Sequence, residues 1–354
     1  CKAMLEWASA NVAFKKCAPH GDEDDVEQWS RRVFSPLAMQ RALRRMRPSG
    51  QAAGIDGWKG VLLRWAPFKL QVMYGDALRR ASLQRQYPDE WSVNLVTHVP
   101  KPGKSVTDIS KMRDLWNCAH GWKVCTQVLR QEYDRVSGFV MPGCQRGFRA
   151  YMNAGEAAGV ASFQTEVATA LCMPVIRLYV DLKGFFMGIQ RKLLYALEGE
   201  LGVATEVTQC IKTVHDVMRG RADTAHGLSE PWKVLTGTGQ GCVCAPRRST
   251  LQLIIMIMAI ERYGGGYCME VPAGASAACF RQVWFADDLS GGARDGQSLQ
   301  CTFDGATIGC RLTGNEIGVD PGGGRSKSAV SVADCDQAGG YVEGEDYDIR
   351  VGMD

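Results

Sequence analysis

Two short apolar segments of this 354-residue chain end in aspartate, and they constrain the fold more than any other feature. The first, residues 175–181, reads VIRLYVD, and the second, residues 282–288, reads QVWFADD. Their β-branched and aromatic residues favour strands. Neighbouring carboxylates at a strand end repel each other, and a divalent cation is the simplest partner that makes such a cluster favourable. For the second segment alone, an Asp-rich hairpin turn without a ligand is the alternative interpretation.

Helical and strand-like patterns interleave along the chain without a steady β-α-β alternation. This order predicts an α+β fold in which a small, mostly antiparallel sheet is backed by helices. Strand-like runs begin near residues 91, 175, 266 and 279. Helical periodicity covers residues 34–47, 59–86, 115–136, 153–171 and 249–263.

Charge is divided unevenly along the chain. Residues 31–150 contain 21 Lys and Arg against 8 Asp and Glu, a net of +13, and the remainder contains 20 against 30, a net of −10. A basic half favours a polyanion partner, and an acidic half favours cation-binding carboxylates. The longest apolar run, at 253–260, is too short to span a bilayer, so we expect no membrane insertion. The 14 cysteines form no Cys-x-x-Cys pair, and we expect mostly reduced thiols in an intracellular protein.

Three motifs in sequence order resemble those of reverse transcriptases, particularly the enzymes of non-LTR retrotransposons and group II introns. LYVDLKGFFMGIQRKLL (178–194) resembles their first catalytic motif, and VWFADDLS (283–290) resembles their Tyr/Phe-x-Asp-Asp motif. Between them, GTGQGCVCAP (237–246) resembles their Gly-x-x-Gln-Gly loop. The resemblance covers roughly residues 34–332. Further similar segments are AGIDGW (53–58), VTHVPKPGKS (96–105), CQRGFRA (144–150) and GRSKSAVSV (324–332).

The resemblance implies a role for each matching residue. Asp181, Asp287 and Asp288 would hold two Mg²⁺ ions, with Mn²⁺ as a substitute. One ion would activate the attacking hydroxyl and the other would stabilise the leaving pyrophosphate, which Lys327 would protonate. The residues implied to bind the dNTP are Arg113, Lys101 (with Lys104 and Lys111 as alternatives), Phe186 and Gln240. The residues implied to bind template or primer are Gln145, Phe148, Arg149 and Gly241.

Some of these residues also have simpler interpretations. The ring of Phe186 would collide with a 2′-hydroxyl and select deoxynucleotides, whereas core packing is the competing role for Phe185 and Phe186. Phe148 is equally a candidate core residue, and Lys327 a candidate surface lysine. A glycine-rich turn such as the one at 237–241 means little without its neighbours.

The implied architecture is the fingers and palm of a right-hand polymerase. Residues 34–174 would form the fingers with part of the palm, and residues 175–332 the palm with the catalytic motifs. Residues 1–33 would be a linker or the end of an upstream region, and residues 333–354 the start of a truncated primer-grip and thumb region. The sequence leaves the oligomeric state open.

The chain departs from the family pattern at three places. Met187 replaces an aspartate, MRDLW (112–116) replaces Arg-Pro-Ile, and Arg247 and Arg248 stand at apolar positions, where they would be costly if buried or would meet nucleic acid. We therefore expect an RNA-directed DNA polymerase acting on an RNA template, a DNA or RNA primer and dNTPs, with nuclear access implied by the family. A catalytically decayed RNA-binding domain and an RNA-templated RNA polymerase are the alternatives.

Overall fold

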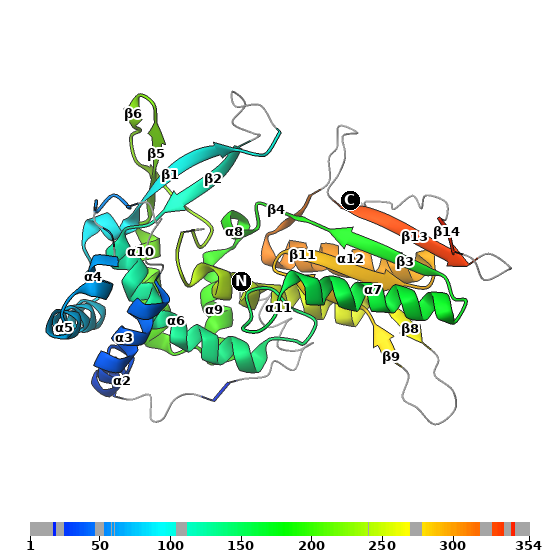
Figure 1. Ribbon diagram of the computed structural model, residues 1–354, viewed down its shortest axis with the longest axis horizontal. Coiled ribbons are helices and arrows are strands. Elements are labelled where there is room, and N and C mark those ends of the chain that lie inside the picture. Colours follow the sequence, from blue (N-terminus) through cyan, green and yellow to red (C-terminus); the bar gives the residue numbers. More distant parts are fainter. Residues whose placement is uncertain are drawn as a thin grey trace. The chain divides into compact units, whose positions relative to one another are not determined.

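In the computed structural model of the chain, the described residues fall into two compact units, each assembled from separate stretches of sequence (Figure 1). Unit 1 takes its described residues from 141–190 and 250–354, and unit 2 from 14–140 and 191–249. The described residues are 17–18, 25–46, 53–57, 59, 61–103, 112–239, 241–269, 278–318, 328–335 and 341–343.

Unit 1 contains a five-stranded sheet in the order β10-β11-β3-β13-β14, and every neighbouring pair in it is antiparallel. β3 lies at its centre, with Leu178 opposite Gly291 on one side and Val330 on the other. Two short antiparallel pairs, β12 with β4 and β8 with β9, also belong to this unit. The strands are β3 (Val175–Val180), β4 (Leu182–Lys183), β8 (Tyr267–Met269), β9 (Ala278–Phe280), β10 (Gln282–Phe285), β11 (Asp288–Ala293), β12 (Glu316–Ile317), β13 (Ala329–Cys335) and β14 (Tyr341–Glu343).

The core of unit 1 lies between one face of this sheet and two helices, α11 (Ala245–Tyr263, of which residues 250–263 belong to this unit) and α12 (Gly296–Thr313). Side chains alternate between the faces of a strand, so every second residue of β3 points to the helices. Ile176, Leu178 and Val180 are at most 2% exposed, and they share one apolar cluster with Ile257 of α11 and Phe303 of α12.

A third helix of unit 1, α7 (Ala154–Ala170), is tied to the other face of the sheet through Arg177. The Arg177 guanidinium donates to Thr165 Oγ1 at 3.0 Å and to Gln164 Oε1 at 3.3 Å. Gly292 lies opposite Arg177, and a β-carbon at Gly292 would lie 2.2 Å from Gln164 Nε2. The sheet is therefore covered by α7 at this end. The remaining helix of the unit is the single turn α8 (Phe185–Gly188).

Unit 2 contains a sheet in the order β2-β1-β5-β6, with β7 also paired to β5. β1 and β5 are parallel, and the other pairs are antiparallel. The strands are β1 (Val93–Pro100), β2 (Met112–Asn117), β5 (Arg219–Thr224), β6 (Gly227–Leu228) and β7 (Trp232–Lys233).

Two helices of unit 2 begin where the sequence supplies a capping side chain. Asp25 accepts from the Gln28 N–H at 3.0 Å, and Ser35 accepts from the Ala38 N–H at 3.3 Å. Pro67 lies between two helices because proline cannot donate within a helix. The helices are α2 (Val26–Val33), α3 (Pro36–Arg45), α4 (Val61–Trp65), α5 (Phe68–Gln84), the 3₁₀ turn η1 (Asp89–Ser92), α6 (His120–Val140), α9 (Arg191–Leu201) and α10 (Thr205–Asp216).

The predicted α+β class is confirmed, and so are the strands at 93–100 and 175–180 and the helices at 36–45, 154–170 and 245–263. The helical pattern at 59–86 is interrupted at Pro67. The MRDLW segment (112–116) lies in strand β2, so the helix predicted at 115–136 begins only at His120. Helix α12 was not predicted. The described part of the chain contains no helix long and apolar enough to cross a membrane.

Candidate active site

Asp181 directly follows the central strand of the unit 1 sheet. Its backbone carbonyl accepts from the Gly318 N–H at 2.7 Å, and its N–H donates to Ser328 Oγ at 3.3 Å. Ser328 Oγ in turn donates to the Gly318 carbonyl at 3.3 Å. A β-carbon at Gly318 would lie 3.0 Å from Asp181 Oδ2, so the carboxylate lies against bare backbone. These contacts fix the position of Asp181 on both sides.

Asp287 lies in the tight turn that joins β10 to β11. Phe285 is paired with Asp288, so only Ala286 and Asp287 lie between the two strands. Ala286 has φ of 56°, which is unusual for a residue with a β-carbon. Asp288 is exposed, and Asp287 is half-buried.

Strand register brings the three carboxylates to one end of the sheet. Val180 is paired with Leu289, so one further step along both strands sets Asp181 opposite Asp288. Val180 and Leu289 both point to α11 and α12, and alternation therefore directs Asp181 and Asp288 to the opposite face. Asp287 lies in the adjoining turn. The arrangement places negative charge at the end of the sheet where β3 and β11 meet the turn.

Within the described residues, no three His, Cys, Asp or Glu side chains are grouped so that they could hold a metal ion by themselves. Mg²⁺ is nevertheless commonly bound by one or two carboxylates together with water and substrate phosphates rather than by an all-protein cage. The Asp181 and Asp287 carboxylates have the oxygen chemistry for such a site.

Gln145 does not reach the surface: it is fully buried, and its side-chain amide bonds Ala286 and Gly147. The predicted contact with template or primer therefore has no support in the side-chain position. Arg149 donates to the backbone carbonyls of Pro142 and Gln145 at 3.0 and 3.1 Å. Both residues brace the loop in which they lie.

Phe186 and Phe148 meet edge to face, with ring centroids 6.1 Å apart. Phe148 is 36% exposed, and Phe186 is only partly covered by the core cluster. Phe185, by contrast, is 2% exposed and belongs to the core, as its simpler interpretation predicted. Phe186 lies five residues after Asp181, on α8, and Phe148 lies in the loop before α7.

Arg113 and Lys101 lie together on the β1–β2 hairpin of unit 2. Arg113 is exposed and opposite Val99, and Lys101 follows Pro100, the last paired residue of β1. Both can therefore present positive charge from one hairpin. Lys104, Lys111, Gln240 and Lys327 lie outside the described residues.

The face of the sheet that carries Arg113 has three more basic residues. Arg113, Arg219 and Arg221 pair with alternate residues of β1, which share one face, and Arg219 is directly opposite Lys233. Asp223 is the acidic residue that register places on the same face. Among the described residues, none of the four cations forms an ion pair with a carboxylate. Like charges directly opposite each other destabilise a sheet, so the Arg219–Lys233 pair is unfavourable without an anion.

The glycine-rich loop before α11 is anchored at both ends. Arg191, which is 8% exposed, donates to the carbonyls of Gly237 (2.7 Å), Val234 (2.8 Å) and Thr236 (3.1 Å). At the other end, a β-carbon on Gly241 would lie 1.9 Å from the Trp116 carbonyl oxygen, so only glycine fits. Burial lowers the pKa of Arg191, and these carbonyl dipoles stabilise its charge. No sequence motif indicated this role for Arg191.

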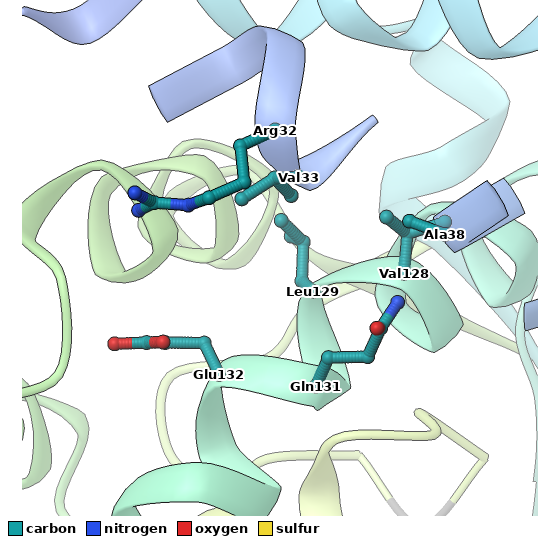
Figure 2. A pocket seen from close by; sticks show the side chains of 7 residues that line it. All are labelled: Arg32, Val33, Ala38, Val128, Leu129, Gln131 and Glu132. Carbon is teal, nitrogen blue, oxygen red and sulfur yellow. The ribbon is translucent and has the colours of Figure 1, made fainter. Parts of the chain in front are cut away.

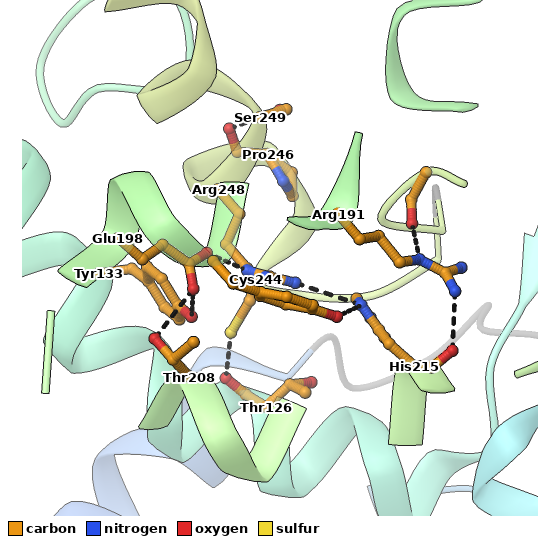
Figure 3. A network of polar contacts seen from close by, with 12 residues as sticks. Thr126, Tyr133, Arg191, Glu198, Thr208, His215, Cys244, Pro246, Arg248 and Ser249 are labelled. Carbon is orange, nitrogen blue, oxygen red and sulfur yellow. Dashed lines mark hydrogen bonds and ion pairs between the residues drawn. The ribbon is translucent and has the colours of Figure 1, made fainter. Parts of the chain in front are cut away.

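Arg248 is fully buried in a network of polar contacts (Figure 3). Its Nε donates to Glu198 Oε1 at 2.5 Å, and its guanidinium lies 5.3 Å from the Tyr195 ring centroid and 5.8 Å from that of Tyr133. Burial alone would lower the pKa of Arg248, but Glu198 raises it well above its ordinary value. Arg248 is thus a structural cation, with no surface left for nucleic acid.

Two further ionisable residues of this region also have internal partners. Arg247 donates to Asp134 Oδ1 at 2.6 Å. His215 is fully buried and shares its Nδ1 with Tyr195 Oη at 3.2 Å (Figure 3). Burial lowers the pKa of His215 well below its ordinary value, and the nearby guanidinium groups act in the same direction. His215 is therefore neutral near pH 7.

A cavity of about 160 Å³ lies elsewhere in unit 2 (Figure 2). Its lining includes the Glu132 side chain, whose carboxylate already accepts from Arg135 at 2.6 Å and from the Ala204 N–H at 3.2 Å. The cavity contains none of the residues that the sequence motifs single out. Its lining residues are Arg32, Val33, Ala38, Val128, Leu129, Gln131 and Glu132.

No protein-family model matches the chain. No curated protein matches it at a significant level.

Proposed function

We propose that this chain is the fingers and palm core of an RNA-directed DNA polymerase, which extends a primer 3′-hydroxyl along an RNA template with dNTPs. The observation that carries the proposal is the strand register that brings Asp181 and Asp288 opposite each other beside the turn containing Asp287. The order of the sequence motifs supports the same function. Helices α11 and α12 give the carboxylates a rigid base.

The candidate metal ligands are Asp181 and Asp287, with Asp288 beside them. Two Mg²⁺ ions bound there would supply the positive charge that favours in-line attack on a phosphorus. The protein contributes position: Gly318 and Ser328 hold the Asp181 backbone, and the β10–β11 turn holds Asp287. The exposed edge of Phe186 is suited to lie beneath a deoxyribose and to exclude a 2′-hydroxyl.

Unit 2 supplies the groups suited to phosphates. Arg113 and Lys101 on the β1–β2 hairpin can grip a triphosphate, because guanidinium and ammonium groups bind phosphate oxygens strongly. The basic sheet face beyond them can bind a nucleic-acid backbone. The segment 236–239, whose carbonyls at Thr236 and Gly237 accept from Arg191, belongs to the motif that would touch the nascent base pair if the family resemblance holds.

Arg247 and Arg248 do not weaken this proposal. Their partners Asp134 and Glu198 lie in the same unit, so the two arginines are consistent with an intact fold as well as with a diverged sequence. Met187 changes a position that is not a metal ligand in the family. The decayed RNA-binding domain is therefore kept as an outcome of the experiment.

Primer extension with purified chain tests the proposal. A labelled primer annealed to RNA is incubated with Mg²⁺ or Mn²⁺ and either dNTPs or NTPs, with a thumb region supplied from the full gene where one exists. The proposal predicts template-dependent extension by dNTPs, and none by the double variant Asp287→Ala/Asp288→Ala.

The other outcomes separate the alternatives. Extension by NTPs in preference to dNTPs indicates an RNA-templated RNA polymerase. If the wild-type chain binds RNA but extends no primer even with a complete thumb present, the chain is the catalytically decayed RNA-binding domain. Extension that survives in the double variant refutes the assignment of the carboxylates.

A further inference from the structure

The Gln145 side chain forms a backbone-like pair with Ala286, the residue before Asp287. Gln145 Nε2 donates to the Ala286 carbonyl at 3.0 Å, and the Ala286 N–H donates to Gln145 Oε1 at 3.1 Å. Oε1 also accepts from the Gly147 N–H at 2.7 Å. The two backbone N–H groups fix which end of the amide carries the oxygen. These polar groups are buried, since Gln145 is 0% exposed and Ala286 is 7% exposed.

The neighbouring backbone continues this pairing. The Trp284 N–H donates to the Cys144 carbonyl, and the Arg146 N–H donates to the Trp284 carbonyl, both at 2.8 Å. Residues 144–147 thus lie along the end of β10 as a short parallel bridge. The segment bonds the β10–β11 hairpin at Trp284, near the end of β10, and at Ala286, within the turn.

The turn needs such support because of its own conformation. It has two central residues, and the first, Ala286, has φ of 56°. Two-residue hairpins with positive φ at the first central position prefer glycine there, since a β-carbon is strained. Without external bonds, Ala286 would relax toward negative φ and carry Asp287 with it.

Gly147 lies two residues after Gln145 in the CQRGFRA motif (144–150), and its contacts account for a glycine at this position. A β-carbon at Gly147 would lie 2.0 Å from the Ala286 nitrogen and 2.6 Å from its Cα. Close approach of the two backbones is therefore possible only with glycine at 147. Gln145 and Gly147 act together on the same residue.

We propose that Gln145 and Gly147 are positioning residues that hold the β10–β11 turn in its strained conformation and thereby set the direction of the Asp287 carboxylate. The effect on catalysis rests on the proposed function, whereas the support of the turn by Gln145 and Gly147 rests only on their contacts with Ala286. It replaces the template contact that the sequence motif implied for Gln145.

The test compares Gln145→Met with a core variant, Phe303→Leu in α12, that removes none of the hydrogen bonds to Ala286. Methionine keeps the length of glutamine but removes every hydrogen bond to Ala286. We expect amide hydrogen exchange in the peptide that covers residues 284–289 to quicken about tenfold or more in Gln145→Met and to remain at the wild-type rate in Phe303→Leu. This readout needs no enzymatic activity.

Steady-state extension supplies the catalytic readout. The kcat of Gln145→Met is expected to fall about tenfold to a hundredfold, because a small misplacement of a reacting group has an effect of that size, while the KM for dNTP stays within about twofold. Adding Ala286→Gly should recover part of the kcat, since glycine adopts positive φ without the support. Rescue of this kind is not expected from a general loss of stability.

Three results would overturn the inference. They are unchanged exchange at 284–289 in Gln145→Met, an equal change in Phe303→Leu, or no rescue by Ala286→Gly in an active enzyme. If Gln145→Met does not fold, two other tests remain. Gln145→Glu should quicken amide exchange at the turn less in the Ala286→Gly background than in the wild-type background. Gly147→Ala should quicken amide exchange at the turn. A wild-type chain without activity but with normal protection of the turn refutes the proposed function and leaves the positioning role standing.

Discussion

Arg248→Met is the substitution whose effect follows most directly from the structure. The Arg248–Glu198 pair is completely buried, with Nε and Oε1 2.5 Å apart. Removing one member of a buried pair leaves the other charge without compensation and typically costs about 3–5 kcal/mol of unfolding free energy. Tyr133 and Thr208 still donate to Glu198 at 3.2 and 3.0 Å, so we expect a loss near the lower end, about 3 kcal/mol.

The second arm of the experiment removes the stranded charge. In Arg248→Met/Glu198→Gln the neutral amide oxygen can still accept from Tyr133 and Thr208. We therefore expect the double variant to recover about 2 kcal/mol of the unfolding free energy lost by Arg248→Met alone. Urea unfolding followed by circular dichroism, with the slope of free energy against urea compared between variants, measures both values.

The result also decides what Arg248 does. If Arg248 contacts nucleic acid, Arg248→Met should weaken RNA binding while leaving the unfolding free energy within about 0.5 kcal/mol of wild type, as for an ordinary surface substitution. That outcome, or strictly additive effects in the double variant, would refute the structural role. The matched surface control is Lys192→Met, an exposed residue in the same helix as Glu198.

Three further predictions concern pH, nucleic acid and sugar selection. Because the folded-state pKa of His215 lies well below its unfolded value, protons bind preferentially to the unfolded chain below about pH 6.5, and the unfolding free energy should decrease by up to about 1.4 kcal/mol for each unit by which the pH is lowered in that range. His215→Gln should flatten this part of the profile of unfolding free energy against pH, measured by urea unfolding. An unchanged profile would contradict the burial argument. Arg219→Gln/Lys233→Gln should reduce the steepness of log affinity for single-stranded RNA against log salt concentration by about 1.4 relative to the control Arg41→Gln/Arg44→Gln, and the Tm should be unchanged or higher. Equal slopes in the two double variants would exclude the sheet face as an RNA-binding surface. Phe186→Val should raise ribonucleotide incorporation in extension assays, and unchanged discrimination would show that the ring is not beneath the sugar.

The strands that carry the carboxylates could be predicted because their signal is local. Each is a short run of β-branched and aromatic residues that ends in Asp181 or in Asp287 and Asp288. The pairing of β3 with β11 joins residues more than a hundred positions apart, and only the motif order suggested it. The sequence thus predicted the ends of the strands, whereas the register came from the fold.

Helix α12 was not predicted because its glycines obscure the helical pattern. A β-carbon at Gly305 would lie 2.9 Å from the Ile260 Cα, and one at Gly309 would lie 2.8 Å from the Met256 Cα. Both glycines let α12 approach α11 closely. Glycine disfavours an isolated helix, so tertiary packing rather than intrinsic propensity explains this element.

The roles of Gln145 and Arg248 depended on partners distant in sequence. Glu198 precedes Arg248 by 50 residues, and Ala286 follows Gln145 by 141. A sequence shows that a polar residue stands at an apolar position, but it does not show which group compensates it. The motif therefore implied a template or primer contact for Gln145, and the sequence left burial and nucleic-acid contact both open for Arg248, whereas the fold uses both side chains internally.

Single-carboxylate variants in RNA-templated primer extension test the central claim most directly. Asp181→Asn and Asp287→Asn remove one charge each. The matched control is Asp304→Asn, an exposed carboxylate on α12 that accepts from Gln300 at 2.8 Å. The proposed site predicts Mg²⁺-dependent extension by the wild type and Asp304→Asn, and a loss of at least about a hundredfold in kcat for the other two. Extension by Asp181→Asn or Asp287→Asn at the rate of Asp304→Asn would contradict it.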